Sequence, residues 1–154
     1  MSILLLENYI KNIIEEKPIS ALHVFDFDMT LYDSYKKRWL DKTLSQLKKS
    51  FDTPEVRTIL CTARSKESSY IIETEKILNQ NNMSLLDFDE CYFKSVNRKE
   101  KVSVYKSNVI LDELKSNRLI EIVKFWDDKT DSLMQTKKDI KSYNKDIVYI
   151  PVKC

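Results

Sequence analysis

Apolar residues along the chain follow two spacings in turn, one typical of helices and one typical of buried strands. From Ile3 to Glu16, apolar side chains recur every three or four positions, which predicts an amphipathic helix. The run from Ala21 to Phe27 is short, apolar and rich in strand-forming side chains. It predicts a buried strand that ends at Asp26. A lysine-rich segment with helical spacing follows from Tyr35 to Leu47, and we expect a second helix there.

The rest of the chain repeats this alternation. Strands are expected at Val56–Cys61, Cys91–Phe93, Leu119–Trp126 and Ile147–Val152, and helices at Glu67–Asn79, Val102–Leu114 and Lys129–Tyr143. Strands separated by helices of this length form right-handed crossovers in a parallel sheet. The predicted fold class is therefore α/β, a Rossmann-like three-layer sandwich with a mainly parallel five-stranded sheet. No repeat or linker divides the sequence, so we expect residues 1–154 to form one domain.

Composition narrows the class of protein. Of 154 residues, 42% are hydrophobic and 32% are charged, a balance found in folded globular proteins rather than in disordered chains. A formal net charge of +2 gives no global reason to bind nucleic acid, although a local basic face is compatible with it. No apolar run approaches the roughly 20 residues that cross a bilayer, and Glu7 interrupts the apolar start. Together with three scattered cysteines, this predicts a cytoplasmic, reducing location without membrane contact.

The sequence contains no glycine, which restricts how its turns are made. Glycine adopts positive φ angles most easily, and Asn and Asp are the next most tolerant residues. We therefore expect any positive φ angle at an Asn or Asp position, for example within residues 79–82 or at Asn117.

Two carboxylates follow the first predicted strand. Asp26 and Asp28 lie two positions apart, where a buried strand runs out. Paired carboxylates of this kind bind hard cations such as Mg²⁺. With charge neutralised, one of them can attack phosphorus while the other transfers protons. Taken alone, the pair is equally compatible with a turn and a helix cap.

Polar residues also end two later strands. Thr62 follows the strand predicted at Val56–Cys61, and Asp127 and Asp128 follow the strand predicted at Leu119–Trp126. A threonine at a strand end is often only a cap, and an aspartate pair is often only solvated. In an open parallel sheet, however, the carboxyl ends of the strands form the edge at which ligands bind.

Taken together, these features resemble a known family. The stretch Asp26-Phe27-Asp28-Met29-Thr30 resembles the first motif of haloacid dehalogenase (HAD) phosphohydrolases, a strand followed by Asp-x-Asp-x-Thr. The strand that ends in Thr62 is similar to the second motif, and the strand that ends in Asp127 and Asp128 is similar to the fourth. These features occur in the family's order, and the resemblance covers residues 21–150.

The resemblance implies a magnesium-dependent phosphatase, that is, a hydrolase acting on phosphoric monoesters. Asp26 would attack phosphorus and form an aspartyl-phosphate, and Asp28 would protonate the leaving group and later deprotonate water. Thr30 would orient the first loop, and Asp128 is preferred over Asp127 for direct metal contact. The implied site comprises the catalytic residues Asp26, Asp28, Thr62 and Lys106, the substrate-binding residues Thr30, Thr62, Arg64 and Lys106, and the Mg²⁺ ligands Asp26, Asp28 (through its backbone carbonyl), Asp127 and Asp128.

The third motif of the family is a lysine that offsets the charge of the phosphate. In the family it often lies near the start of the helix before the fourth strand. Lys106 fits this position, because Leu111 and Leu114 follow it at helical spacing. Lys94, just past the third predicted strand, is the competing candidate, and either side chain is also compatible with an exposed surface lysine.

A branch of the family associated with RNA repair, called Swiss Army Knife RNA repair-like, is more closely similar. It typically has Thr-Gly-Arg, Phe-Asp, Leu-Lys, Phe-Lys and Glu-Asp-Arg. The corresponding stretches here are Thr62-Ala63-Arg64, Phe88-Asp89, Phe93-Lys94, Tyr105-Lys106 and Asp127-Asp128-Lys129. The chain departs from that pattern at Ala63, Asp127 and Lys129, and it has Met29 where the superfamily most often has glycine.

The spacing of the motifs limits the size of any cap over the site. Residues from about 31 to 55 leave room only for a small helical insertion, so we expect no cap or a minimal one. An open site admits a phosphorylated small molecule, a nucleic-acid end or another macromolecular phosphate. Basic residues near the entrance would suit a polyanion or simply form a solvated helix face: Lys36, Lys37, Arg38, Lys48 and Lys49.

A different class of function fits the same residues. The chain is also compatible with a noncatalytic HAD-fold module that serves as a binding partner or as a subunit of a larger complex. The sole histidine, His23, lies inside the first predicted strand, and we expect it to be a packed residue rather than a catalyst.

Overall fold

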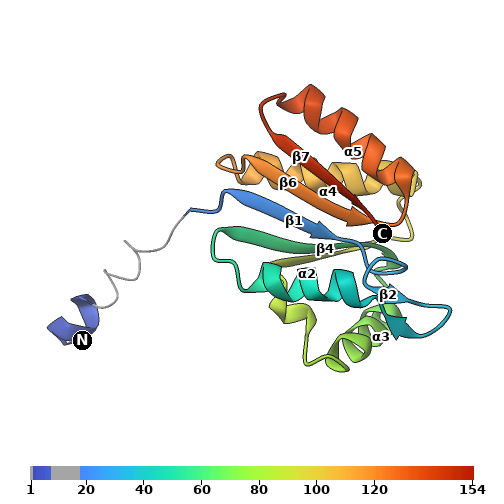
Figure 1. The fold of residues 1–154 in the computed structure, drawn as a ribbon, viewed down its shortest axis with the longest axis horizontal. Helices are drawn as coiled ribbons and strands as arrows, with labels where there is room; N and C mark the ends of the chain where they lie inside the picture. Colours follow the sequence, from blue (N-terminus) through green and yellow to red (C-terminus); the bar gives the residue numbers. More distant parts are fainter. Residues whose placement is uncertain (1, 8–17) are drawn as a thin grey trace.

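A five-stranded parallel sheet organises the protein (Figure 1), whose computed structural model describes residues 2–7 and 18–154. The spatial order is β5-β4-β1-β6-β7, and every neighbouring pair is parallel. The strands are β1 (Ala21–Phe25), β4 (Val56–Ser65), β5 (Glu90–Lys94), β6 (Ile122–Asp127) and β7 (Val148–Lys153). The predicted α/β class and the five strands are therefore confirmed.

Helices cover both faces of this sheet, as Figure 1 shows. The helices are α2 (Asp41–Phe51), α3 (Ser68–Asn79), α4 (Val102–Ser116) and α5 (Thr130–Tyr143), with a short 3₁₀ turn, η1 (Leu85–Asp87), before β5. None of the helices within residues 2–7 and 18–154 is long and apolar enough to cross a membrane.

Alternating side chains of the central strands divide the core in two. Leu22 and Val24 of β1 belong to a cluster with buried residues of α4 and α5. Phe25 belongs to a second cluster, with buried residues of α2 and α3. Because successive side chains of a strand point to opposite faces, one apolar strand can anchor both helical layers.

The segment after Thr30 differs from its prediction. It forms a hairpin of β2 (Tyr32–Asp33) and β3 (Arg38–Trp39), and the helix α2 begins only at Asp41. The backbone N–H groups of Tyr35 and Lys36 both donate to Asp33 Oδ1 at 3.0 Å. Such local bonds offer the backbone an alternative to a helix. The prediction missed the hairpin because the apolar residues of this segment have helical spacing.

The other predicted elements are present with shifted ends. β1 stops at Phe25, one position before Asp26, and β4 continues past Thr62 to Ser65. Residues 3–7 are helical, as expected, and the remainder of the helix expected up to Glu16 lies outside the described residues.

Positive φ angles occur at three described residues. Asn82 has φ 58°, as expected, but Met29 (60°) and Lys37 (51°) also adopt the left-handed region. Asn117 does not, since its φ is −130°. The expectation that only Asn or Asp would take this conformation was therefore wrong. At Met29 and Lys37 the geometry of the turn imposes a positive φ angle that the residue disfavours. The conformational cost is roughly 1–2 kcal/mol for each such residue.

Candidate active site

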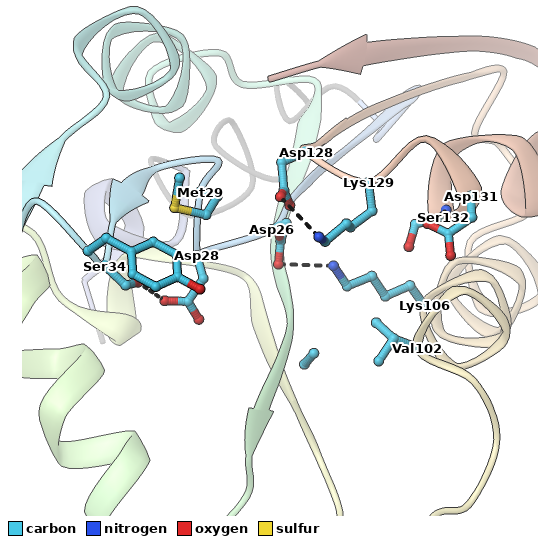
Figure 2. Close-up of a pocket in the computed structure, with 12 residues that line it drawn as sticks. Asp26, Asp28, Met29, Ser34, Val102, Lys106, Asp128, Lys129, Asp131 and Ser132 are labelled. Carbon is cyan, nitrogen blue, oxygen red and sulfur yellow. Dashed lines mark hydrogen bonds and ion pairs between the residues drawn. The ribbon is translucent and has the colours of Figure 1, made fainter.

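The site lies at the carboxyl edge of three adjacent strands. In register, Phe25 of β1 lies between Leu60 of β4 and Trp126 of β6. The residues that follow these positions therefore meet at one edge of the sheet, as expected for the carboxyl ends of parallel strands. A pocket of about 480 Å³ opens there, and its lining includes Asp26 and Asp128 (Figure 2).

A buried lysine joins the carboxylates of two of these strands. Lys106 comes from α4, and its Nζ lies 3.0 Å from Asp26 Oδ1 and 2.6 Å from Asp127 Oδ2. The residues are nearly inaccessible to solvent, with exposed fractions of 2% for Lys106, 4% for Asp26 and 0% for Asp127. Burying an ammonium costs several kcal/mol unless it is paired, and here two carboxylates pair it.

The charges in this cluster do not cancel. Burial and the nearby Asp127 raise the pKa of Asp26 to about 7, although Lys106 opposes the rise. Burial likewise raises the pKa of Asp127 against the pull of Lys106. Burial alone would lower the pKa of Lys106, but the two carboxylates outweigh it and raise that pKa. The cluster therefore holds two carboxylates for one ammonium, which favours the uptake of a further positive charge, either a proton or a metal ion.

Asp128 adds a third carboxylate at the mouth of the cluster. One oxygen each from Asp26, Asp127 and Asp128 lies within 4.8 Å of the others, and this group can hold a metal ion. Carboxylate oxygens are the ligands preferred by Mg²⁺. The donor set and its excess negative charge therefore fit a divalent cation. Lys129 Nζ lies 3.9 Å from Asp128 Oδ2, at the exposed side.

The carboxylate of Asp28 is engaged away from this cluster. Arg64 donates to it in bidentate fashion, from Nε to Oδ2 and from Nη2 to Oδ1, both at 2.8 Å. Ser34 Oγ also donates to Oδ1, a contact visible in Figure 2. Partial burial would raise the pKa of Asp28, but the bonds from Arg64 and Ser34 prevail and lower it. The carboxylate of Asp28 is thus ionised in this arrangement.

Arg64 was expected to bind substrate, and the structure places its guanidinium on protein groups. Besides Asp28, its Nη1 donates to Thr74 Oγ1 at 3.2 Å and lies 3.5 Å from Glu73 Oε2. The guanidinium also stacks over the ring of Phe27, with Cζ 4.6 Å from the centroid. These contacts fix the position of the Arg64 side chain and of the Asp28 carboxylate that it binds.

Two threonines predicted for the site are buried, and one of them contacts Asp26. Thr30 Oγ1 donates to Asp26 Oδ2 at 3.1 Å, which orients that carboxylate. Thr62 Oγ1 accepts a bond from the backbone N–H of Arg64 at 3.1 Å. Of the two candidate lysines, Lys106 lies beside Asp26, whereas Lys94 Nζ donates to the backbone carbonyl of Arg98.

Sequence reasoning missed several residues that line the pocket. Ser34 arrives from the hairpin, and Lys129, Asp131 and Ser132 arrive from the start of α5. Ser34 carried no recognisable signal, because a helix was predicted near it. The α5 residues directly follow the Asp127-Asp128 pair, so their position after a strand end could have indicated them.

Comparisons with known proteins identify the family of the chain and a similar fold. The chain matches the family described as HAD domain family 1 in Swiss Army Knife RNA repair proteins, over residues 11–153. Among solved structures, it is similar to a chain in the structure of the Pnkp1/Rnl/Hen1 RNA repair complex, with a TM-score of 0.64 and 18% identity. The match covers 88% of this chain but only 43% of that chain, so this protein spans less than half of that relative. At this identity, the likeness supports the fold alone. A comparison with curated proteins gave no match.

Proposed function

Because the chain belongs to HAD domain family 1 of Swiss Army Knife RNA repair proteins, whose membership supports a phosphatase-like role, we propose that it is a Mg²⁺-dependent phosphomonoesterase. Asp26 is its nucleophile and carries an aspartyl-phosphate intermediate. The observation that carries this proposal is the buried contact of Lys106 with Asp26 and Asp127, with Asp128 completing a three-carboxylate group. We further propose that residues 1–154 form a single HAD-like domain, in which residues 31–55 include a small cap-like segment.

Asp26 is held in position for attack. Thr30 binds one carboxylate oxygen and Lys106 binds the other, so the side chain is fixed from both sides. In the first step, one oxygen of Asp26 bonds to phosphorus as the bond from phosphorus to the leaving oxygen breaks. The leaving oxygen takes a proton from Asp28. In the second step, water gives a proton to Asp28 and attacks the aspartyl-phosphate, and the bond between phosphorus and the Asp26 oxygen breaks. This releases inorganic phosphate and restores Asp26.

Mg²⁺ would be held by Asp26, Asp127 and Asp128, with the backbone carbonyl of Asp28 as the further expected ligand. When bound, the ion offsets the negative charge of the carboxylates and of the phosphoryl oxygens. Lys106 supplies a second, permanent positive charge beside the nucleophile. Phosphoryl transfer depends mainly on such positioning and charge neutralisation.

Asp28 is the proposed proton-transfer residue. Its contacts with Arg64 and Ser34 keep it ionised, which suits the step in which it accepts a proton from water. Protonating the leaving group requires the opposite state. We therefore expect phosphates with good leaving groups to depend less on Asp28 than alkyl phosphates do. Thr62 and Lys106 bind the transferring phosphoryl group in this scheme.

The proposed substrate is a phosphorylated nucleic-acid end or another macromolecular phosphate. The small size of the segment between the first two motifs and the membership in a family of RNA repair proteins support this choice. Lys129 is 68% exposed in its side chain at the pocket mouth, where it can meet an approaching anion.

The test is hydrolysis by purified protein with and without Mg²⁺, using p-nitrophenyl phosphate and a 3′-phosphorylated oligonucleotide. Asp26→Asn should lower kcat by at least about 100-fold, since it removes the nucleophile. Asp146→Asn, at an exposed position far along the chain, is the matched control and should retain the wild-type rate. Mg²⁺ should raise the Tm of the wild type, and Asp128→Asn should reduce that rise.

Equal rates for the wild type and Asp26→Asn would overturn the mechanism. If the wild type released no phosphate from any phosphomonoester tried, the alternative function would be favoured, namely a noncatalytic HAD-fold module within a larger complex. Release from small phosphomonoesters but not from oligonucleotides would leave the phosphatase proposal intact and remove the nucleic-acid end as its substrate.

A further inference from the structure

The hairpin of β2 and β3 presents a solvent-exposed aromatic ring at the pocket. Tyr35 is 89% exposed, yet it lines the same pocket as Asp26 and Asp28. Single exposed apolar side chains are ordinary on protein surfaces. Tyr35 differs because it lies in the wall of a pocket whose other residues include the proposed nucleophile.

The backbone that carries Tyr35 is fixed rather than loose. Asp33, which is buried, accepts bonds from the N–H groups of Tyr35 and Lys36 at 3.0 Å each. Tyr32 pairs with Trp39 across the hairpin, and their rings meet edge to face with centroids 5.7 Å apart. The ring of Tyr35 is therefore displayed from an ordered turn, which lowers the entropy lost when a ligand packs on it.

The same hairpin is bonded directly to the catalytic loop. Ser34 Oγ donates to the carboxylate of Asp28, and the N–H of Met29 donates to the carbonyl of Tyr32 at 2.7 Å. Tyr35 thus lies one residue from a side chain that contacts the proposed proton-transfer group. Because Tyr35 and Asp26 line the same pocket, a ligand that packs on the ring can extend to Asp26.

The residues after Tyr35 are positively charged. Lys36, Lys37 and Arg38 are all exposed. An aromatic ring beside a run of cations is the combination that binds single-stranded nucleic acid, because bases stack on the ring and backbone phosphates meet the cations. A small phosphate ester would need only the interior of the pocket and not a ring that points into solvent.

From these contacts we propose that residues 35–38 form a nucleotide-binding subsite of the active site. Tyr35 stacks on the base of the nucleotide that bears the terminal phosphate, and the three basic side chains contact the adjoining backbone phosphates of a single strand. This inference rests on the proposed phosphatase function and specifies which part of the substrate the hairpin recognises.

The first test compares substrates with and without a base. The substrates are a 3′-phosphorylated oligonucleotide, the same oligonucleotide with an abasic terminal nucleotide, and acetyl phosphate, which has no ring. Tyr35→Ala should lower kcat/KM on the intact oligonucleotide by roughly 5- to 100-fold. It should leave the abasic substrate and acetyl phosphate within about twofold, while Tyr35→Phe should retain most of the activity. Tyr143→Ala, at another exposed tyrosine, is the control.

The second test measures binding without turnover. An oligonucleotide with 2-aminopurine as its terminal base should lose fluorescence when it binds the Asp26→Asn protein. The loss of fluorescence should be much smaller with the double variant that also carries Tyr35→Ala. The proposed subsite would be overturned if Tyr35→Ala lowered kcat/KM equally on all three substrates, or did not lower it on the intact oligonucleotide. It would also be overturned by a preference for a phosphopeptide that survives Tyr35→Ala. If no variant turned over any substrate, the phosphatase proposal would fail, and the fluorescence signal would still decide the subsite.

Discussion

Lys106 shows how a single side chain determines the character of the site. It extends from α4 to the pocket, where it is almost inaccessible to solvent, and meets Asp26 and Asp127 there. An ammonium in such a place is stable only because two carboxylates pair it. In the same way, the two carboxylates are tolerated together because the ammonium lies between them. The site is therefore a network whose members depend on one another.

Removing the ammonium should expose that dependence. Lys106→Met leaves two buried carboxylates facing each other and should lower the free energy of unfolding by about 3–5 kcal/mol at pH 7.5. Urea unfolding followed by circular dichroism measures it.

Lys94→Met is the matched control, because Lys94 bonds only a backbone carbonyl outside the cluster among its described contacts. It should change stability by less than about 0.5 kcal/mol. If Lys106→Met does not fold alone, the pair Lys106→Met with Asp127→Asn should recover folded protein, since one carboxylate is then gone. A larger loss for Lys94→Met than for Lys106→Met would contradict the assignment.

At the scale of elements, the hairpin of β2 and β3 connects the core to the pocket mouth. Tyr32 is buried in the same core cluster as Phe27, while Ser34 bonds Asp28 and Tyr35 reaches solvent. The turn requires a left-handed residue, and without glycine Lys37 takes that conformation with φ 51°. The contacts of the hairpin with the core and with Asp28 thus outweigh the conformational cost of the positive φ angle at Lys37.

Lys37→Gly should remove that cost. We expect the free energy of unfolding to rise by about 0.5–1 kcal/mol, because relief of the left-handed strain exceeds the added flexibility of the unfolded chain. Thermal unfolding of the metal-free protein measures the change. Lys36→Gly, one position earlier and without a positive φ angle, should give no gain. Equal losses in both variants would show that the turn is not strained.

At the scale of the whole molecule, His23 links one helix layer to the sheet. Its Nδ1 lies 2.8 Å from Ser50 Oγ in α2, and that hydroxyl lies 2.6 Å from Thr58 Oγ1 in β4. The imidazole also meets the ring of Trp126 in β6 edge to face, with centroids 5.1 Å apart. The expectation that His23 packs rather than catalyses agrees with these contacts.

This position gives the fold a pH dependence. Burial, assisted by the charge of Lys124, lowers the pKa of His23 to about 4 from the ordinary 6.5. Between these values the unfolded chain binds a proton that the folded protein does not, so stability is full above pH 6.5 and falls as the pH drops toward 4. His23 is only partly buried, and with solvent screening we expect a loss of about 1–2 kcal/mol.

Urea unfolding at pH 7.5 and pH 5 measures this loss, with His23→Gln as the comparison. The variant should lose less stability between the two pH values than the wild type, since it cannot take up that proton. Parallel losses in the two proteins would show that His23 is not the source of the pH dependence.

The sequence by itself determined the sheet, the helices around it and the acidic edge. Hydrophobic spacing is a local property, so the strands and helices could be predicted from short windows. Parallel strands end at the same edge, so Asp26, Thr62 and Asp127 were expected to meet without any knowledge of distances. The ends of elements were less certain, because the local pattern does not show which hydrogen bonds are made there.

Tertiary structure alone decided the partners of the charged side chains. Arg64 turns to Asp28 rather than to the pocket, and Lys106 rather than Lys94 enters the cluster. It also decided that the basic residues after Tyr35 stand on a hairpin and not on a helix. A long charged side chain can reach several groups at similar cost, and its choice depends on the desolvation and geometry of residues far away in the chain. That information is absent from spacing and present only in the folded arrangement.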